Sequence, residues 1–215
     1  MPVVRGGVVT HAYRWRVSLR SICVFCASSP GTDPALLDVA REVGAGLARR
    51  GIRVVYGGGG SGLMGALADG ALGEGGEVVG IIPGFMVDRE WGRQDLTELH
   101  VVDSMHERKA LMAEHADAFL VLPGGIGTLE EFFEVWTWRQ IGLHATPIAL
   151  LDLPTETGEG FWQPLLQALR GIYRGGFVSE ASLDDVIVAA GLEAALEGLE
   201  ERAAAGQTRI LRPGS

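Results

Sequence analysis

The sequence has few basic residues, one lysine and two cysteines. Its 215 residues include 18 basic residues and 27 acidic ones, which gives a net charge of −9, and Lys109 is the only lysine. An acidic chain is repelled by nucleic-acid phosphates and by anionic lipid, so we expect neither a nucleic-acid nor a membrane partner. No run of 18 apolar residues occurs, so no membrane span is predicted. Chemistry through a lysine imine would have to use Lys109.

The two cysteines form a C-x-x-C pattern, Cys23 and Cys26, at the end of an apolar run that is typical of a strand. Residues three apart on a strand point to opposite faces, so the two thiols should diverge. No second cysteine pair completes a zinc site, and the five histidines show no ligand spacing, so a metal site is not supported. The pattern predicts buried, reduced cysteines in a cytoplasmic protein.

Glycine is abundant: 32 residues, without collagen periodicity. This share is about twice the usual one and indicates many tight turns and places where the backbone approaches another group closely. Apolar residues at 47% and charged residues at 21% are ordinary values for a globular domain.

The chain alternates short apolar runs with helical patterns and shows no internal linker. Residues 1–20 carry four arginines and no acid, and we expect a flexible N-terminal extension there, a domain over 21–204 and a C-terminal tail over 205–215. The predicted strands are 21–26, 52–56, 77–82, 98–102, 118–122, 147–151 and 185–188, and the predicted helices are 34–50, 63–72, 105–115, 129–141, 161–173 and 192–204. This alternation predicts one doubly wound α/β domain with a mostly parallel sheet, in which ligands bind in the loops that follow strands.

The first such loop is glycine-rich and runs from Gly57 to Gly65. It contains G-x-G-x-x-G, but the next predicted strand ends without the acid that a dinucleotide ribose requires, and the G-K-[ST] of a Walker loop is absent. Gly59, Gly60 and Ser61 are candidates to bind a phosphate or a sugar hydroxyl. The alternative is a tight turn without a ligand.

The second loop, PGGIGTLEE over 123–131, also lies between a strand and a helix. Gly124, Gly125 and Gly127 leave backbone amides unobstructed, and Thr128 adds a hydroxyl. We expect Glu131 to be ionised, because the positive end of the helix dipole favours the charged form. In the alternative interpretation, Thr128 and Glu131 form a capping box and Glu131 only bonds back to the backbone.

The third element is SMHERKA over 104–110. Ser104 and Glu107 fit a capping box, so Glu107 is expected to be structural. Arg108 and Lys109 lie in the first turns of the same helix, where the dipole disfavours cations, so a nearby anion should compensate them. A phosphate ligand or a glutamate would serve, and a solvated charged face is the alternative.

GGGGSGLMG, SMHERKALM and PGGIGTLEE, in this order and spacing, resemble the LONELY GUY (LOG) family of cytokinin riboside 5′-monophosphate phosphoribohydrolases, also described as possible lysine decarboxylases. The resemblance covers roughly Ile22 to Asp152. It implies a Rossmann-like fold, a homodimer, and hydrolysis of the N-glycosidic bond of an N6-modified AMP to free base and ribose 5-phosphate. It implies no metal or redox cofactor.

Carried over by position, the resemblance implies that Arg108 and Glu131 are catalytic. The residues that would contact the nucleotide are Glu90, Lys109, Gly125, Ile126, Gly127, Thr128, Leu129, Glu130 and Thr137. A nucleosidase without preference for a modified base, a non-catalytic nucleotide carrier and a pyridoxal-phosphate decarboxylase are the competing functions.

Overall fold

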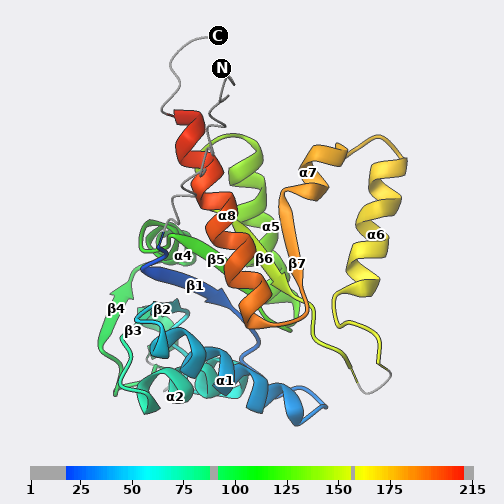
Figure 1. The fold of residues 1–215 in the computed structure, drawn as a ribbon. Helices are drawn as coiled ribbons and strands as arrows, with labels where there is room; N and C mark the ends of the chain where they lie inside the picture. Colours follow the sequence, from blue (N-terminus) through cyan, green and yellow to red (C-terminus); the bar gives the residue numbers. More distant parts are fainter. Residues whose placement is uncertain (1–17, 88–91, 156–157, 211–215) are drawn as a thin grey trace, which may run out of the picture.

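A parallel β-sheet forms the centre of the chain. The computed structural model describes residues 18–87, 92–155 and 158–210, and side chains to residue 206. Within these residues the sheet has seven strands in the order β4-β3-β2-β1-β5-β6-β7, all parallel (Figure 1). The strands are β1 (Ser21–Phe25), β2 (Arg53–Tyr56), β3 (Val78–Pro83), β4 (Glu98–Val102), β5 (Ala118–Val121), β6 (Ile148–Leu151) and β7 (Val186–Ala189). The predicted doubly wound α/β domain is confirmed.

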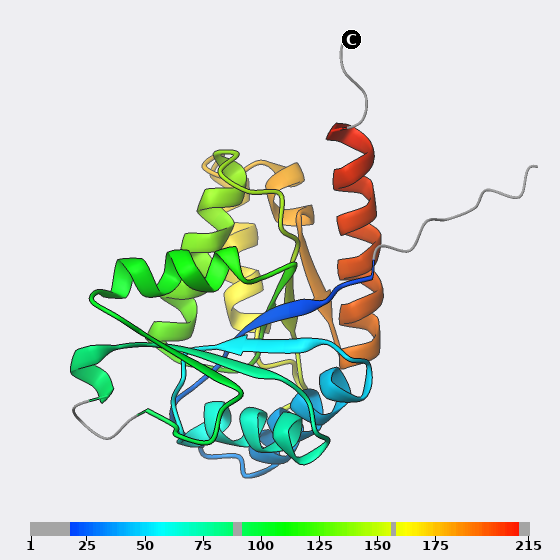
Figure 2. The same cartoon turned by 90° about the vertical axis from the view of Figure 1, so that its left-hand side faces the viewer.

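Helices cover both faces of the sheet (Figures 1 and 2). The helices are α1 (Ala35–Arg49), α2 (Gly62–Gly73), α3 (Gly84–Val87), α4 (Met105–Glu114), α5 (Ile126–Gln140), α6 (Gln163–Arg174), α7 (Glu180–Asp184) and α8 (Leu192–Ile210). Side chains of α1, α2 and α8 pack in one core on one face, and side chains of α4, α5 and α6 pack in a second core on the other. No helix of the described chain is both long and apolar enough to cross a membrane.

Alternation along β1 separates these two cores. Ile22 and Val24 belong to the core under α1, α2 and α8, whereas Cys23 and Phe25 belong to the core under α4, α5 and α6. Cys26 lies in the first core, so the two cysteines are on opposite sides, buried and not joined in a disulfide. The predicted divergence of the thiols is confirmed, and it follows from the period of two residues along a strand.

The strand order reverses at β1, which lies between β2 and β5. In open α/β sheets the loops at the carboxyl ends of the strands separate at such a point and leave a crevice. The loops after β1, β2 and β5 therefore border the expected ligand site.

Two helix boundaries differ from the prediction. Helix α5 begins at Ile126 rather than Leu129, because Gly125 takes the N-cap position. The residues that follow Gly125 are weak helix formers, so the sequence pattern did not indicate the first turn. Helix α8 continues to Ile210, past the predicted end at Ala204 and into the predicted tail. The short helices α3 and α7 have no predicted counterpart, and each is too short for a periodic pattern.

Helices α1 and α2 pack with their backbones nearly in contact, and glycines permit this approach. A Cβ added to Gly44 would lie 2.0 Å from the carbonyl oxygen of Leu67, and one added to Gly70 would lie 1.9 Å from that of Arg41. Both obstacles are backbone atoms, which a rotamer change cannot move.

We therefore expect Gly44→Ala to destabilise the fold, although alanine favours a helix. Overpacking of this kind costs about 1–3 kcal/mol, which lowers the urea midpoint of unfolding. Gly73→Ala is the matched control, since a Cβ at the end of α2 meets nothing within 4 Å. Equal midpoints for the two variants would contradict the close helix contact.

Candidate active site

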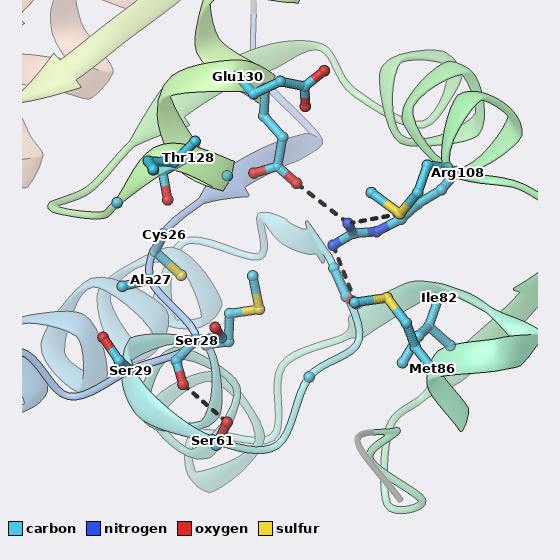
Figure 3. A pocket seen from close by; sticks show the side chains of 18 residues that line it. Cys26, Ala27, Ser28, Ser29, Ser61, Ile82, Met86, Arg108, Thr128 and Glu130 are labelled. Carbon is cyan, nitrogen blue, oxygen red and sulfur yellow. Dashed lines mark hydrogen bonds and ion pairs between the residues drawn. The ribbon is translucent and has the colours of Figure 1, made fainter. Parts of the chain in front are cut away.

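A cavity of about 460 Å³ lies at the carboxyl ends of β1, β2 and β5. This volume is within the range of sites that bind small molecules. The lining residues come from the loops after these strands, from the strand end of β3 and from helices α2, α3, α4 and α5 (Figure 3): Cys26, Ala27, Ser28, Ser29, Gly57, Gly59, Ser61, Met64, Ile82, Met86, Met105, Arg108, Gly125, Ile126, Gly127, Thr128, Glu130 and Glu131.

The loop after β2 is held against the loop after β1 by a close backbone contact. The Ser61 hydroxyl donates a hydrogen bond to the carbonyl of Ser28 at 2.9 Å (Figure 3). Gly62 has a φ of 59°, and a Cβ there would lie 2.4 Å from the Ser28 carbonyl carbon. Glycine at this position is therefore required both by backbone conformation and by space.

The opposite wall is the N-terminus of α5. Gly125 is its N-cap without a side-chain cap, so the amides of the first turn, at Ile126, Gly127 and Thr128, have no partner within the helix. These residues line the cavity, and unpaired amides at the positive end of a helix favour an anion. Gly124 keeps the loop tight, because a Cβ there would lie 2.1 Å from the Thr128 hydroxyl oxygen.

Arg108 is buried, with 5% of its surface exposed, and its guanidinium is anchored on strand ends. Its Nε donates to the carbonyl of Ile81 at 3.1 Å and its Nη2 to the carbonyl of Gly57 at 3.4 Å. Nη1 lies 3.5 Å from Oε1 of Glu131 and 3.8 Å from the sulfur of Met105. The predicted neighbouring anion of Arg108 is thus Glu131.

Glu131 is also 5% exposed, and burial raises the pKa of its carboxyl to about 7, although Arg108 lowers it. The expectation of a fully ionised carboxylate is therefore corrected: burial outweighs the nearby positive charges. The capping-box alternative is also wrong, because Thr128 lies inside α5 and, among the described residues, no hydrogen bond joins Glu131 to the Thr128 backbone. A carboxyl with a pKa near 7 can exchange a proton at neutral pH.

Lys109 lies beside this site and is not among the residues that line the cavity. Its ammonium forms ion pairs with Glu130 at 2.5 Å and with Glu134 at 2.9 Å. Burial lowers the pKa of Lys109, but the bonds to the two glutamates outweigh it and the net shift is upward. Glu130 and Glu134 therefore supply the predicted anion for this residue. On the same helix, Ser104 accepts from the Glu107 amide, which confirms that capping contact.

The cavity brings together many of the predicted site residues. Gly59, Ser61, Arg108, Gly125, Ile126, Gly127, Thr128, Glu130 and Glu131 line it. Gly60, Lys109, Gly124, Leu129 and Thr137 do not, and their contact with a ligand stays a prediction. Leu129 packs on the core, and the Thr137 hydroxyl donates to the Phe133 carbonyl at 2.7 Å. Glu90 lies outside the described residues.

Sequence reasoning missed two parts of the lining. One is the loop after β1, Cys26 to Ser29, which the rule of strand-end loops could have identified because β1 precedes it directly. The other is an apolar wall of four side chains from separate elements, for which no local pattern exists: Met64, Ile82, Met86 and Met105.

The fold and the cavity define a doubly wound α/β protein with a small-molecule site at the strand reversal, lined by an anion-binding helix N-terminus and a buried arginine–glutamate pair. A family model described as "Possible lysine decarboxylase" matches residues 64–199. The chain is 45% identical to the cytokinin riboside 5′-monophosphate phosphoribohydrolase of Rhodococcoides fascians, over 86% of this chain and 91% of that protein. It is 40% identical to the phosphoribohydrolase LOG1 of Arabidopsis thaliana, over 85% of this chain and 83% of that one. The chain belongs to the LOG family.

Solved structures at lower identity share the fold. The X-ray structure of TM1055 superposes with a TM-score of 0.62 at 23% identity, covering 85% of this chain and 99% of that one. The molybdenum cofactor carrier protein of Chlamydomonas reinhardtii superposes with a TM-score of 0.59 at 21% identity, covering 86% and 98%. At this identity the likeness concerns the fold alone.

The raised pKa of Glu131 predicts a pH dependence of stability. Between about pH 4.5 and 7 the folded chain binds a proton at Glu131 more tightly than the unfolded chain does, so this group stabilises the fold at low pH and loses that contribution as pH rises. Urea titrations give the unfolding free energies of the wild type and of Glu131→Gln. The difference, wild type minus variant, should therefore fall from pH 5 to pH 8. A difference that stays flat over this range would contradict the raised pKa.

Proposed function

We propose that this protein hydrolyses the N-glycosidic bond of adenosine 5′-monophosphate and its N6-modified derivatives, releasing the free base and ribose 5-phosphate. The observation that carries the proposal is the buried pair of Arg108 and Glu131, which faces the cavity beside the free amides at the start of α5. Membership of the LOG family, whose relatives named above are phosphoribohydrolases, supports the same substrate class.

The two sides of the cavity suit the two ends of such a substrate. The amides of Ile126, Gly127 and Thr128 favour the 5′-phosphate, and binding there would hold the ribose in a fixed position. The apolar wall of Met64, Ile82, Met86 and Met105 favours the base and an apolar N6 substituent. A net charge of −9 does not oppose this binding, because the amides and Arg108 act locally.

In the proposed reaction the bond between N9 of the base and C1′ of the ribose breaks, and its electron pair leaves with the base. Positive charge develops on the ribose, and the Glu131 carboxylate stabilises it more in the transition state than in the ground state. Water adds to C1′, its proton passes to Glu131 or to solvent, and the base takes up a proton. Arg108 holds Glu131 in place and neutralises part of the charge of the bound nucleotide.

The surroundings of Lys109 argue against the decarboxylase function that the family description suggests. Pyridoxal phosphate requires a lysine amine that forms an imine, and such amines have lowered pKa values. Lys109 is the only lysine, its pKa is raised, and Glu130 and Glu134 hold its ammonium. A spectrum of the purified protein incubated with pyridoxal phosphate should therefore lack an internal aldimine band.

Chromatographic assay of purified protein with a panel of nucleoside 5′-monophosphates tests the proposal. We expect base release from AMP or from N6-isopentenyl-AMP, and the ratio of the two rates distinguishes a selective enzyme from a broader nucleosidase. Glu131→Ala should lower turnover by on the order of 100-fold or more while the protein stays folded. Arg108→Ala should lower turnover or weaken binding.

The matched control for these variants is Glu197→Ala on the exposed side of α8, which should keep wild-type turnover. A wild-type protein that binds AMP without releasing adenine would instead be a nucleotide carrier. Glu131→Ala with unchanged turnover would contradict a catalytic role for this glutamate.

We also propose that the chain forms a homodimer through α5. Ile126, Phe133 and Ile141 lie on one stripe of this helix and the residue after it, and they are 87%, 36% and 65% exposed. An exposed apolar stripe of this kind favours association.

Light scattering should give twice the chain mass for the wild type and a monomer for Phe133→Glu. Phe177→Glu, at an exposed site between α6 and α7, is the control and should stay dimeric. A wild-type monomer would overturn the proposal.

A further inference from the structure

Gly57 follows β2 directly and lines the cavity. Its neighbour Gly58 has a φ of 74°, a conformation that favours glycine, whereas Gly57 itself does not adopt a positive φ. The φ at position 57 therefore does not by itself require glycine. The reason for glycine there must lie in the space around it.

That space is filled by Arg108. A Cβ built on Gly57 would lie 1.9 Å from Nη2 and 3.1 Å from Cζ of Arg108, and the next nearest atom is the terminal methyl of Met64 at 3.4 Å. All three are side-chain atoms, in contrast to the backbone obstacles at Gly44 and Gly70. A side chain at position 57 would thus displace the guanidinium rather than the fold.

The same glycine also helps to orient the guanidinium. Its carbonyl accepts from Nη2 of Arg108 at 3.4 Å, while the carbonyl of Ile81 accepts from Nε at 3.1 Å. With these two contacts made at the ends of β2 and β3, Nη1 faces Glu131 at 3.5 Å and the Met105 sulfur at 3.8 Å. The direction of Arg108 is therefore set by the two backbone carbonyls and by the space that the absent side chain of Gly57 leaves for Nη2.

We propose that Gly57 is a positioning residue for the reaction: the absence of a side chain there gives the Arg108 guanidinium its place against the strand ends, opposite Glu131. Gly57 acts through Arg108 and need not touch the substrate. The catalytic part of this inference rests on the proposed function, whereas the positioning of Arg108 relative to Glu131 does not.

The pKa of the Glu131 carboxyl can be measured by titration. It would stay unchanged if Gly57 only supported the fold. The charged groups that act on its carboxyl are Arg108 and Lys109, which lower its pKa, and Glu130 and Glu134, which raise it, and the buried thiols of Cys23 and Cys26 are also close enough to interact with it. Burial is the largest influence. The Arg108 cation lowers the pKa of Glu131 against the effect of burial. Displacing this cation weakens the lowering, so the pKa of Glu131 should rise further.

The test is a double-mutant cycle of Gly57→Ala and Arg108→Lys. Gly57→Ala alone should lower kcat by on the order of 10- to 100-fold, because a small misplacement of a catalytic group has effects of that size. It should also move both the carbon-13 carboxyl titration of Glu131 and the inflection of kcat/KM to higher pH. In the Arg108→Lys background the added methyl no longer meets Nη2, so Gly57→Ala should change kcat and the titration little.

Gly73→Ala controls for the general effect of replacing glycine by alanine, because its Cβ meets nothing within 4 Å. If Gly57→Ala only lowers the melting temperature, with kcat and the Glu131 titration unchanged, the inference is overturned. If Gly57→Ala fails to fold, the double variant should fold. Failure of the double variant would show that the obstacle is not Arg108 and would also overturn the inference.

The titration separates this inference from the proposed function. A wild-type protein that releases no base from any nucleotide contradicts the function, yet the Glu131 titration still reports whether Gly57 positions Arg108. Conversely, an active wild type with equal effects of Gly57→Ala in both backgrounds keeps the function and rejects the positioning role.

Discussion

The buried ion pair of Arg108 and Glu131 is the interaction on which the rest of the site depends. Both residues are 5% exposed and their nearest charged atoms are 3.5 Å apart. Taking two charges out of water is costly, and a pair at this separation recovers only part of the cost. The guanidinium also donates to the carbonyls of Ile81 and Gly57 and to the Met105 sulfur, whereas the carboxyl keeps a pKa of about 7. The pair is therefore suited to chemistry at neutral pH rather than to stability.

Close packing of other atoms against the backbone requires glycine at several positions around the site. Gly62 meets the Ser28 backbone, Gly65 meets the Gly60 carbonyl and Gly124 meets Thr128, each at a distance that a Cβ would violate. The contact of Gly62 with Ser28 holds the loops after β1 and β2 together, and the Ala27 amide donates to the Pro123 carbonyl at 3.3 Å, which joins the loops after β1 and β5. A cavity built mainly of such loops leaves amides available for an anion and places few charged side chains around the ligand.

The family is described in two ways, as phosphoribohydrolases and as possible lysine decarboxylases. The environments of two adjacent residues distinguish these two descriptions. Arg108 points into the cavity, and Lys109, one position further along α4, pairs with Glu130 and Glu134. Neighbouring positions on a helix point about 100° apart, so one residue can face the ligand while the next binds the neighbouring helix. The lysine that a decarboxylase would need is thus held by carboxylates, and the arginine is the cation at the site.

The sequence by itself determined the alternation of strands and helices, the divergence of Cys23 and Cys26, the loop that holds Ser61, and the helices that hold Arg108 and Glu131, because periodicity and turn chemistry are local. Only the tertiary structure decided that Glu131 is buried with a raised pKa, that Lys109 belongs to an ion-pair cluster, and that the loop after β1 joins the cavity. Desolvation and ion pairing depend on which distant segments pack together, and the spacing of residues along a chain does not contain that information.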